Sequence, residues 1–143
     1  LLEFFKILKG KGTYLLINTA ASHKPEKWYN EAFDTFGPGE WVFGIDGLPN
    51  ESHKYRINQD GEKLFEMAKL CAKKGITTRW QYIIFKYNEN HIEQARQMAK
   101  DNGIIFEIST SARFEGPDDP YRPTNPYHYI DPTQFAFVRK LNV

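Results

Sequence analysis

The fold is indicated by the stretch Trp41-Val42-Phe43-Gly44-Ile45-Asp46-Gly47-Leu48, which is followed eight residues later by Arg56. This apolar run has the length of a β-strand and ends in a carboxylate and a glycine. A polar segment follows it, and then an amphipathic helical pattern. Such an order is typical of a β/α unit that places a charged side chain at the carboxyl end of a buried strand, where open α/β sheets and barrels bind their ligands.

The same order recurs along the chain and predicts an α/β fold with a parallel sheet. Four strands are predicted: Thr13–Asn18, Trp41–Asp46, Arg79–Lys86 and Ile104–Thr110. Helical patterns fill residues 25–36, 62–74 and 91–101. The apolar run within the first strand is uninterrupted, as expected of a strand that is covered on both faces. Alternation of strands and helices predicts βαβ crossovers between parallel strands.

Four parallel strands leave two open sheet edges, whereas a closed barrel of eight strands needs roughly 200 residues or more. The chain is therefore a small open sheet or part of a larger partial TIM-like barrel. Its first residues have apolar positions at helical spacing and no initiator Met, so the chain begins as if inside an amphipathic helix. We expect a fragment, with a preceding barrel segment in a longer polypeptide.

Composition changes after Phe114, where five prolines forbid long regular elements. We therefore predict two regions, a β/α partial-barrel region at 1–114 and a Pro/Tyr-rich tail at 115–143. The run Phe135-Ala136-Phe137-Val138 within the tail predicts a last short strand.

Composition also limits the classes of function. The chain has 143 residues, of which 41% are apolar and 15% aromatic, as expected of a folded domain. A net charge of +1 without blocks of like charge argues against nucleic acid or an anionic membrane as a partner. No run approaches the ~18 apolar residues of a membrane span. A lone Cys71 excludes an internal disulfide, and a cytoplasmic protein is expected.

Polar residues near the ends of the predicted strands are the candidate ligand-binding residues. Strand alternation puts Gly44 on the same face as Asp46, and a glycine there lets a ligand approach the backbone. Arg56 in the following loop suits a carboxylate or phosphate, which its guanidinium binds in a bidentate fork. The complete candidate set is Asn18, Gly44, Asp46, Arg56, Gln81 and Asn88.

Each candidate also has an ordinary structural interpretation, and these stay open. Asp46-Gly47 is a common turn pair, Arg56 fits a surface arginine, and Asn88 fits a helix cap. Glu107 interrupts an apolar strand and also fits a solvent-facing position. The histidines have no metal-ligand spacing, so no metal ligand is predicted. A different barrel enzyme, such as an aldolase, would need a lysine inside a strand, and Lys86 is the one lysine that fits. No catalytic residue is indicated.

Several motifs together resemble the radical S-adenosylmethionine (radical SAM) superfamily. The run Gly44-Ile45-Asp46-Gly47-Leu48, then His53-Lys54-Tyr55-Arg56, is similar to the fourth-strand region of the branch with Ser-x-Asp-Gly and a loop ending Tyr-Arg. The unit from Tyr82 to Gly103 resembles its fifth strand and helix. Asn18 stands where the third strand commonly reads Thr-Asn-Gly, and Ser109-Thr110-Ser111-Ala112-Arg113-Phe114 falls at the sixth.

The resemblance implies strands 3 to 6 of a partial (β/α)6 barrel. It also implies a [4Fe–4S] cluster at which S-adenosylmethionine is reductively cleaved to start radical chemistry on a small-molecule or peptide substrate. Arg56 would meet the cofactor's carboxylate, and Asp46, Asn88 and Gln81 its ribose. Gly44 departs from the family's serine. The Cys-x-x-x-Cys-x-x-Cys motif is absent from this chain, so the cluster ligands are expected outside it.

One alternative belongs to a different class of function. A non-catalytic α/β binding module would use Asp46, Arg56 and the tail to hold a partner protein or a small ligand. It would fold alone and have no affinity for S-adenosylmethionine.

Overall fold

The computed structural model describes residues 1–131 of the chain. Its elements in order are α1 (Leu2–Gly10), β1 (Leu15–Thr19), α2 (Glu26–Thr35), β2 (Gly39–Gly44), the 3-10 turn η1 (Ser52–Lys54), α3 (Gly61–Lys73), β3 (Thr77–Ile83), α4 (Ile92–Asp101), β4 (Ile105–Ser109) and the 3-10 turn η2 (Pro126–His128). The predicted run Phe135–Val138 lies outside the described residues.

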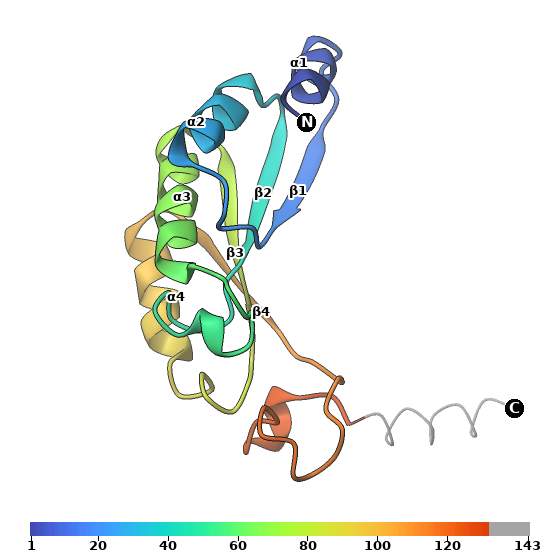
Figure 1. Ribbon diagram of the computed structural model, residues 1–143, viewed down its shortest axis with the longest axis vertical. Coiled ribbons are helices and arrows are strands. Elements are labelled where there is room, and N and C mark those ends of the chain that lie inside the picture. Colours follow the sequence, from blue (N-terminus) through green and yellow to red (C-terminus); the bar gives the residue numbers. More distant parts are fainter. Residues whose placement is uncertain (132–143) are drawn as a thin grey trace, which may run out of the picture.

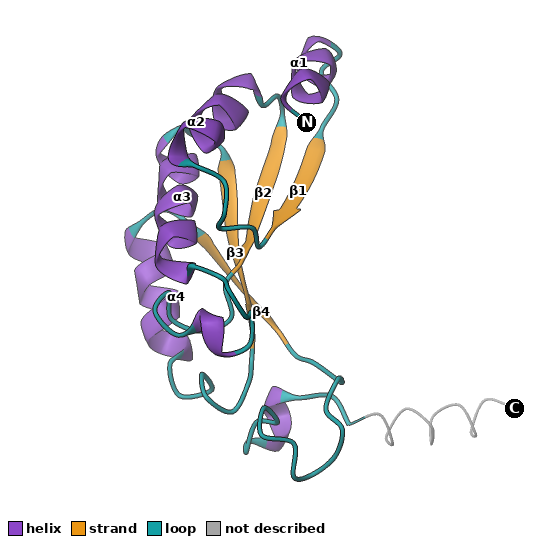
Figure 2. Cartoon of the chain, in the orientation of Figure 1, coloured by secondary structure: helices purple, strands orange, loops and turns teal. Residues whose placement is uncertain are grey.

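One sheet organises the fold. Its strands lie in the order β1-β2-β3-β4, and each neighbouring pair is parallel. Helices α2, α3 and α4 line one face of this sheet, while α1 lies near the amino-terminal ends of β1 and β2 (Figure 1). The predicted α/β class with parallel β/α units is confirmed, and the arrangement is that of a sector of a TIM-like barrel (Figure 2).

Aromatic side chains fill the layer between the sheet and its helices. Trp41, Phe43, Trp80 and Tyr82 project from β2 and β3 and are fully buried or nearly so. The ring of Phe33 on α2 meets Trp41 edge to face at 5.1 Å between centroids. Phe5 anchors α1 against Trp41 at 5.9 Å. Such pairs contribute about 0.5–1.5 kcal/mol each beyond the burial of their surface.

Local sequence explains why α3 forms where the pattern predicted it. The Asp60 carboxylate caps the helix by accepting a hydrogen bond from the Lys63 amide at 2.9 Å. The face of α3 that meets the sheet carries the predicted apolar residues, including Leu64, Ala68 and Cys71, all fully buried. Gly75 has a φ of +80°, a left-handed conformation that suits glycine just after a helix.

No helix covers the second face of the sheet within the described residues (Figure 1). Tyr14 and Leu16 on this face are 64% and 55% exposed, so the expectation that the first strand is covered on both faces was wrong for this chain. In β2 and β3 the same face carries Val42, Gly44 and Gln81, because side chains alternate along a strand. We call this uncovered surface the open face.

Strand ends differ from the predicted ones by a few residues. The second strand ends at Gly44 and the third at Ile83, so Asp46 and Lys86 lie in the loops that follow. Beyond β4, residues 111–131 have no regular element other than η2 and an isolated parallel bridge between Ser111 and Tyr129, in keeping with their many prolines. The boundary at residue 114 stays a prediction. Within residues 1–131, no helix is long and apolar enough to cross a membrane.

Cys71 gives a direct test of this packing. Its side chain is fully buried, and burial raises the pKa of the thiol to about 12. We expect the native protein to react with a thiol reagent such as dithionitrobenzoate at pH 8 far more slowly than the urea-unfolded chain. Equal rates in the two states would contradict the position of α3 against the sheet.

Candidate functional site

Asp46 joins the carboxyl ends of two strands to the loop that carries Arg56. The carboxylate lies just beyond β2 and is completely buried. Its Oδ1 accepts a hydrogen bond from the Ile83 amide at 3.0 Å, and its Oδ2 accepts one from Arg56 Nε at 2.7 Å. Both carboxylate oxygens therefore hold protein groups, and the direct contact of Asp46 with Arg56 was not predicted from the sequence.

Arg56 lies across Gly44 on the open face. A Cβ atom on Gly44 would come within 3.0 Å of Arg56 Nη2 and 3.3 Å of Cζ, so the glycine leaves the space that the guanidinium occupies. The arginine side chain is 26% exposed. Within residues 1–131, its Nη atoms have no hydrogen-bond acceptor, so their N–H groups remain available to a carboxylate or phosphate.

Two residues that sequence reasoning missed hold this loop in place. Ser52 Oγ accepts a hydrogen bond from the Asp46 amide at 2.9 Å and donates one to Gln59 Oε1 at 2.5 Å. Gln59 Nε2 in turn donates to the carbonyls of Ala20, at 2.9 Å, and Gly44, at 3.0 Å. The buried Gln59 amide therefore ties the ends of β1 and β2 to the Arg56 loop. Nothing in the local sequence distinguishes these two polar loop residues.

Asn18 and Gln81 lie on the open face near Arg56. Register pairs Asn18 with Val42, and Gln81 with Gly44, so the two amides flank the strand that Arg56 crosses. Neither side-chain amide makes a hydrogen bond to another residue in the described part of the chain. Both are therefore available to the hydroxyl or carbonyl groups of a ligand.

Asn88 has a different environment from the other candidates. It is fully buried in the loop between β3 and α4. Its Oδ1 accepts from the Phe85 amide at 2.8 Å, and its Nδ2 donates to the Ile83 carbonyl at 3.0 Å. These bonds close the turn after β3. A ligand contact for Asn88 stays a prediction, and it would require the amide to give up one of them.

Burial controls the ionisation of the groups behind Arg56. Burial raises the pKa of Asp46, although the Arg56 guanidinium and the Ile83 amide oppose the shift. Tyr87 donates a hydrogen bond to the Asp46 carbonyl at 2.5 Å, and burial raises the pKa of its hydroxyl. Tyr87 is therefore a neutral hydrogen-bond donor at physiological pH. Asp46 contributes to the site by holding the guanidinium of Arg56.

A second charge network crosses the open face nearer the amino ends of the strands. Arg79 Nε donates to Glu40, and Arg79 Nη1 lies 3.9 Å from Glu107 Oε2. Tyr14 also reaches Glu40, at 3.4 Å. Glu107 is about half exposed, which agrees with the solvent-facing interpretation of this residue. Because ligands of β/α sheets bind at the carboxyl ends of the strands, we assign this network to stability.

Comparison with known proteins supports the fold. A crystal structure of a domain of pyruvate-formate lyase-activating enzyme from Bacteroides vulgatus ATCC 8482 superposes with a TM-score of 0.57. The match covers 99% of this chain and 83% of that chain at 8% sequence identity. No family model matches this chain, and no curated protein does. At such low identity the likeness establishes the fold alone.

The arrangement suits recognition of an anionic group. It offers a fixed guanidinium and two flanking amides on an uncovered sheet face. Within residues 1–131, no group of three or more His, Cys, Asp or Glu side chains is placed to hold a metal ion. The single cysteine is buried on α3, away from the strand ends. An iron–sulfur cluster therefore does not fit the residues of this chain.

Replacing Ser52 by Ala tests the network that supports Arg56. The change leaves the buried Asp46 amide and Gln59 Oε1 without their partner, which costs about 1–3 kcal/mol of unfolding free energy. Urea unfolding followed by fluorescence measures this loss. Ser109→Ala is the matched control, because the Ser109 hydroxyl bonds to no other residue of the described chain. Equal stability of the two variants would contradict the network.

Proposed function

We propose that this chain forms the cofactor-recognising part of a radical SAM enzyme, with the cluster-binding segment supplied by polypeptide outside it. Two independent observations support this proposal. The sequence motifs resemble that superfamily in order and spacing. The fold also matches a domain of an activating enzyme that belongs to a radical SAM family.

The observation that carries the proposal is the position of Arg56. S-adenosylmethionine presents a carboxylate, an ammonium, a sulfonium and two ribose hydroxyls. Arg56 would bind the carboxylate through its Nη atoms, while Asp46 holds the guanidinium by Nε. The amides of Asn18 and Gln81 would bind ribose hydroxyls. Asp46 and Asn88 support these residues through the hydrogen bonds that they make within the protein.

The branch of the superfamily that this chain resembles has serine at the position of Gly44. In this chain the Arg56 side chain occupies the space over Gly44, so a side chain at this position would displace the guanidinium. We infer that the arginine takes over the contact that the serine hydroxyl makes in the family. The substitution is thus linked to the position of Arg56.

The [4Fe–4S] cluster is the part of the proposed chemistry that this chain does not carry. At such a cluster S-adenosylmethionine supplies the radical that abstracts hydrogen from a substrate. Exposed apolar residues favour an adjoining polypeptide at this end of the sheet: Leu1, Phe4 and Ile7 at the start of the chain and Leu16 on β1 are all exposed. Exposed apolar residues that group into a patch mark interaction sites. The substrate, a small molecule or a peptide, is not indicated by any residue.

A second candidate is a non-catalytic module that binds a carboxylate-bearing partner. The same free Nη atoms of Arg56 favour it, because anion recognition by arginine needs no cofactor. This candidate predicts comparable binding of simple carboxylates and no preference for S-adenosylmethionine.

Calorimetric titration of the chain with S-adenosylmethionine and its decarboxylated form tests the proposal. We expect the native chain to prefer the carboxylated ligand, because only that ligand engages Arg56. Arg56→Lys removes the planar fork and should reduce the preference by about tenfold, or ~1.4 kcal/mol. Arg113→Ala is the control, since this exposed arginine also follows a strand and its side chain has no partner within the described residues.

Two results would decide against the proposal. Equal affinity of the native chain for the two ligands would remove Arg56 from cofactor recognition. Binding of acetate or citrate that depends on Arg56, without binding of S-adenosylmethionine, would favour the module instead.

A further inference from the structure

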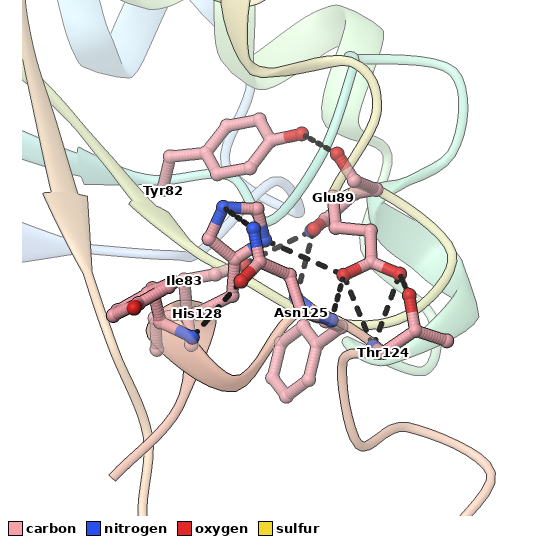
Figure 3. Close-up of polar contacts among 9 residues, drawn as sticks. Tyr82, Ile83, Glu89, Thr124, Asn125 and His128 are labelled. Carbon is pink, nitrogen blue, oxygen red and sulfur yellow. Dashed lines mark hydrogen bonds and ion pairs between the residues drawn. The ribbon is translucent and has the colours of Figure 1, made fainter.

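Glu89 is a buried carboxylate that lies outside the site described above. It sits in the loop between β3 and α4 and is 8% exposed. Both of its oxygens accept hydrogen bonds from the Thr124 amide, each at 3.1 Å, and Oε1 also accepts one from the Thr124 hydroxyl. The Asn125 amide at 3.2 Å and His128 Nδ1 at 3.4 Å meet Oε2 (Figure 3).

These bonds attach a distant segment, residues 115–131, which we call the strap. Burial by itself would raise the pKa of Glu89, but the hydrogen bonds from Thr124, Asn125 and His128 outweigh burial and lower it. The carboxylate is therefore ionised at neutral pH, and its bonds to the strap are charge-assisted. Asn125 also orders the strap locally, because its Oδ1 accepts from the Tyr127 amide at 3.0 Å.

The other part of the strap reaches the loop that carries Arg56. The Tyr121 carbonyl accepts from the Lys86 amide at 2.9 Å, next to the end of β3. The Tyr121 ring packs edge to face on Tyr55 at 5.4 Å, and its hydroxyl donates to the Lys54 carbonyl at 3.2 Å. Tyr55 also packs on Phe85 at 4.1 Å between centroids.

We propose that Glu89 is a positioning residue for Arg56, which acts by anchoring the strap and through the contact of Tyr121 with the Arg56 loop. Tyr55 is the residue before Arg56, so a strap that holds Tyr55 and the Lys54 carbonyl fixes the backbone from which the guanidinium projects. This inference rests on the proposed function only for the identity of the ligand. Placement of the loop by the strap does not depend on it.

The geometry explains why the Arg56 loop needs this second support. Ser52 and Gln59 fix its two ends, but Lys54 and Tyr55 lie between them on the surface. Tyr55 is 37% exposed and finds its ring contacts in Phe85 and in Tyr121 of the strap. Only two residues separate Tyr121 from Thr124, so anchoring at Glu89 limits the movement of the ring.

Hydrogen exchange read by mass spectrometry tests the inference without any ligand. Tyr121→Ala removes the ring and hydroxyl that meet the loop, and Glu89→Gln removes the charge that anchors the strap. We expect each to speed exchange of the amides of residues 52–58 by about tenfold or more, while amides of β2 and β3 keep native rates. Tyr127→Ala is the control, because its 89% exposed ring lies on the same strap.

Tyr121→Phe keeps the ring and removes only the bond to Lys54, so it should fall between the native chain and Tyr121→Ala. This series stays informative if Glu89→Gln fails to fold. Native exchange rates at residues 52–58 in Tyr121→Ala, or the same increase in Tyr127→Ala, would overturn the inference.

A second measurement separates a positioning role from general destabilisation. In the folded Glu89→Gln and Tyr121→Ala proteins, the preference for S-adenosylmethionine over its decarboxylated form should fall severalfold, as in Arg56→Lys. An unchanged preference in both variants would overturn the positioning role. If the native chain binds neither ligand, the proposed function fails. Faster exchange of the loop amides in Tyr121→Ala would still show that the strap holds the Arg56 loop in place.

Discussion

The structure at the strand ends depends on one buried carboxylate. Asp46 accepts the Ile83 amide with one oxygen and Arg56 Nε with the other, so it links β2, β3 and the following loop. A buried carboxylate is tolerated only when its charge and its lone pairs are met, and these two donors meet them. Removing the arginine would leave that charge unpaired, and removing the aspartate would free the guanidinium from Gly44.

The two faces of the sheet differ, and the Asp46–Arg56 contact places the guanidinium on the face that has no helices. Helices cover one face, and the side chains of Trp41, Phe43 and Trp80 on that face are shielded from solvent. The other face stays open, and Arg56, Asn18 and Gln81 lie on it. A parallel sheet normally has both faces covered, and in the proposed function a ligand and further polypeptide would cover this one. Asn18 and Gln81, whose side-chain amides have no partner within residues 1–131, lie on that face together with exposed apolar residues such as Leu16.

Strand ends show where sequence reasoning was limited. The run Trp41–Asp46 was predicted as one strand, but β2 ends at Gly44 and Asp46 lies in the loop. One more backbone hydrogen bond joins the Ile45 amide to the Gln81 carbonyl at 3.1 Å. Apolar residues continue past the ladder because Ile45 packs in the core, so hydrophobicity alone cannot mark the last paired residue. Strand alternation nevertheless predicted that Gly44 and Asp46 share a face, and Arg56 was placed in the loop that follows them. The contacts of Arg56 with Asp46 and Gly44 were not predicted. Gln59 and Glu89 were not singled out, since they bond to remote segments. Ser52 was not singled out because nothing in its local sequence distinguishes it from other polar loop residues.

The sequence by itself determined the alternation of strands and helices, the inner faces of the helices, and the residue types at the strand ends. These depend on periods of two and 3.6 residues and on turn chemistry, which are local properties. The tertiary structure alone decided that Asp46 bonds to an amide 37 residues away, Gln59 to a carbonyl 39 residues away, and Glu89 to an amide 35 residues away. Such partners are chosen by how strands and loops cross in space, because a buried polar group bonds to whichever donor or acceptor the packing brings to it.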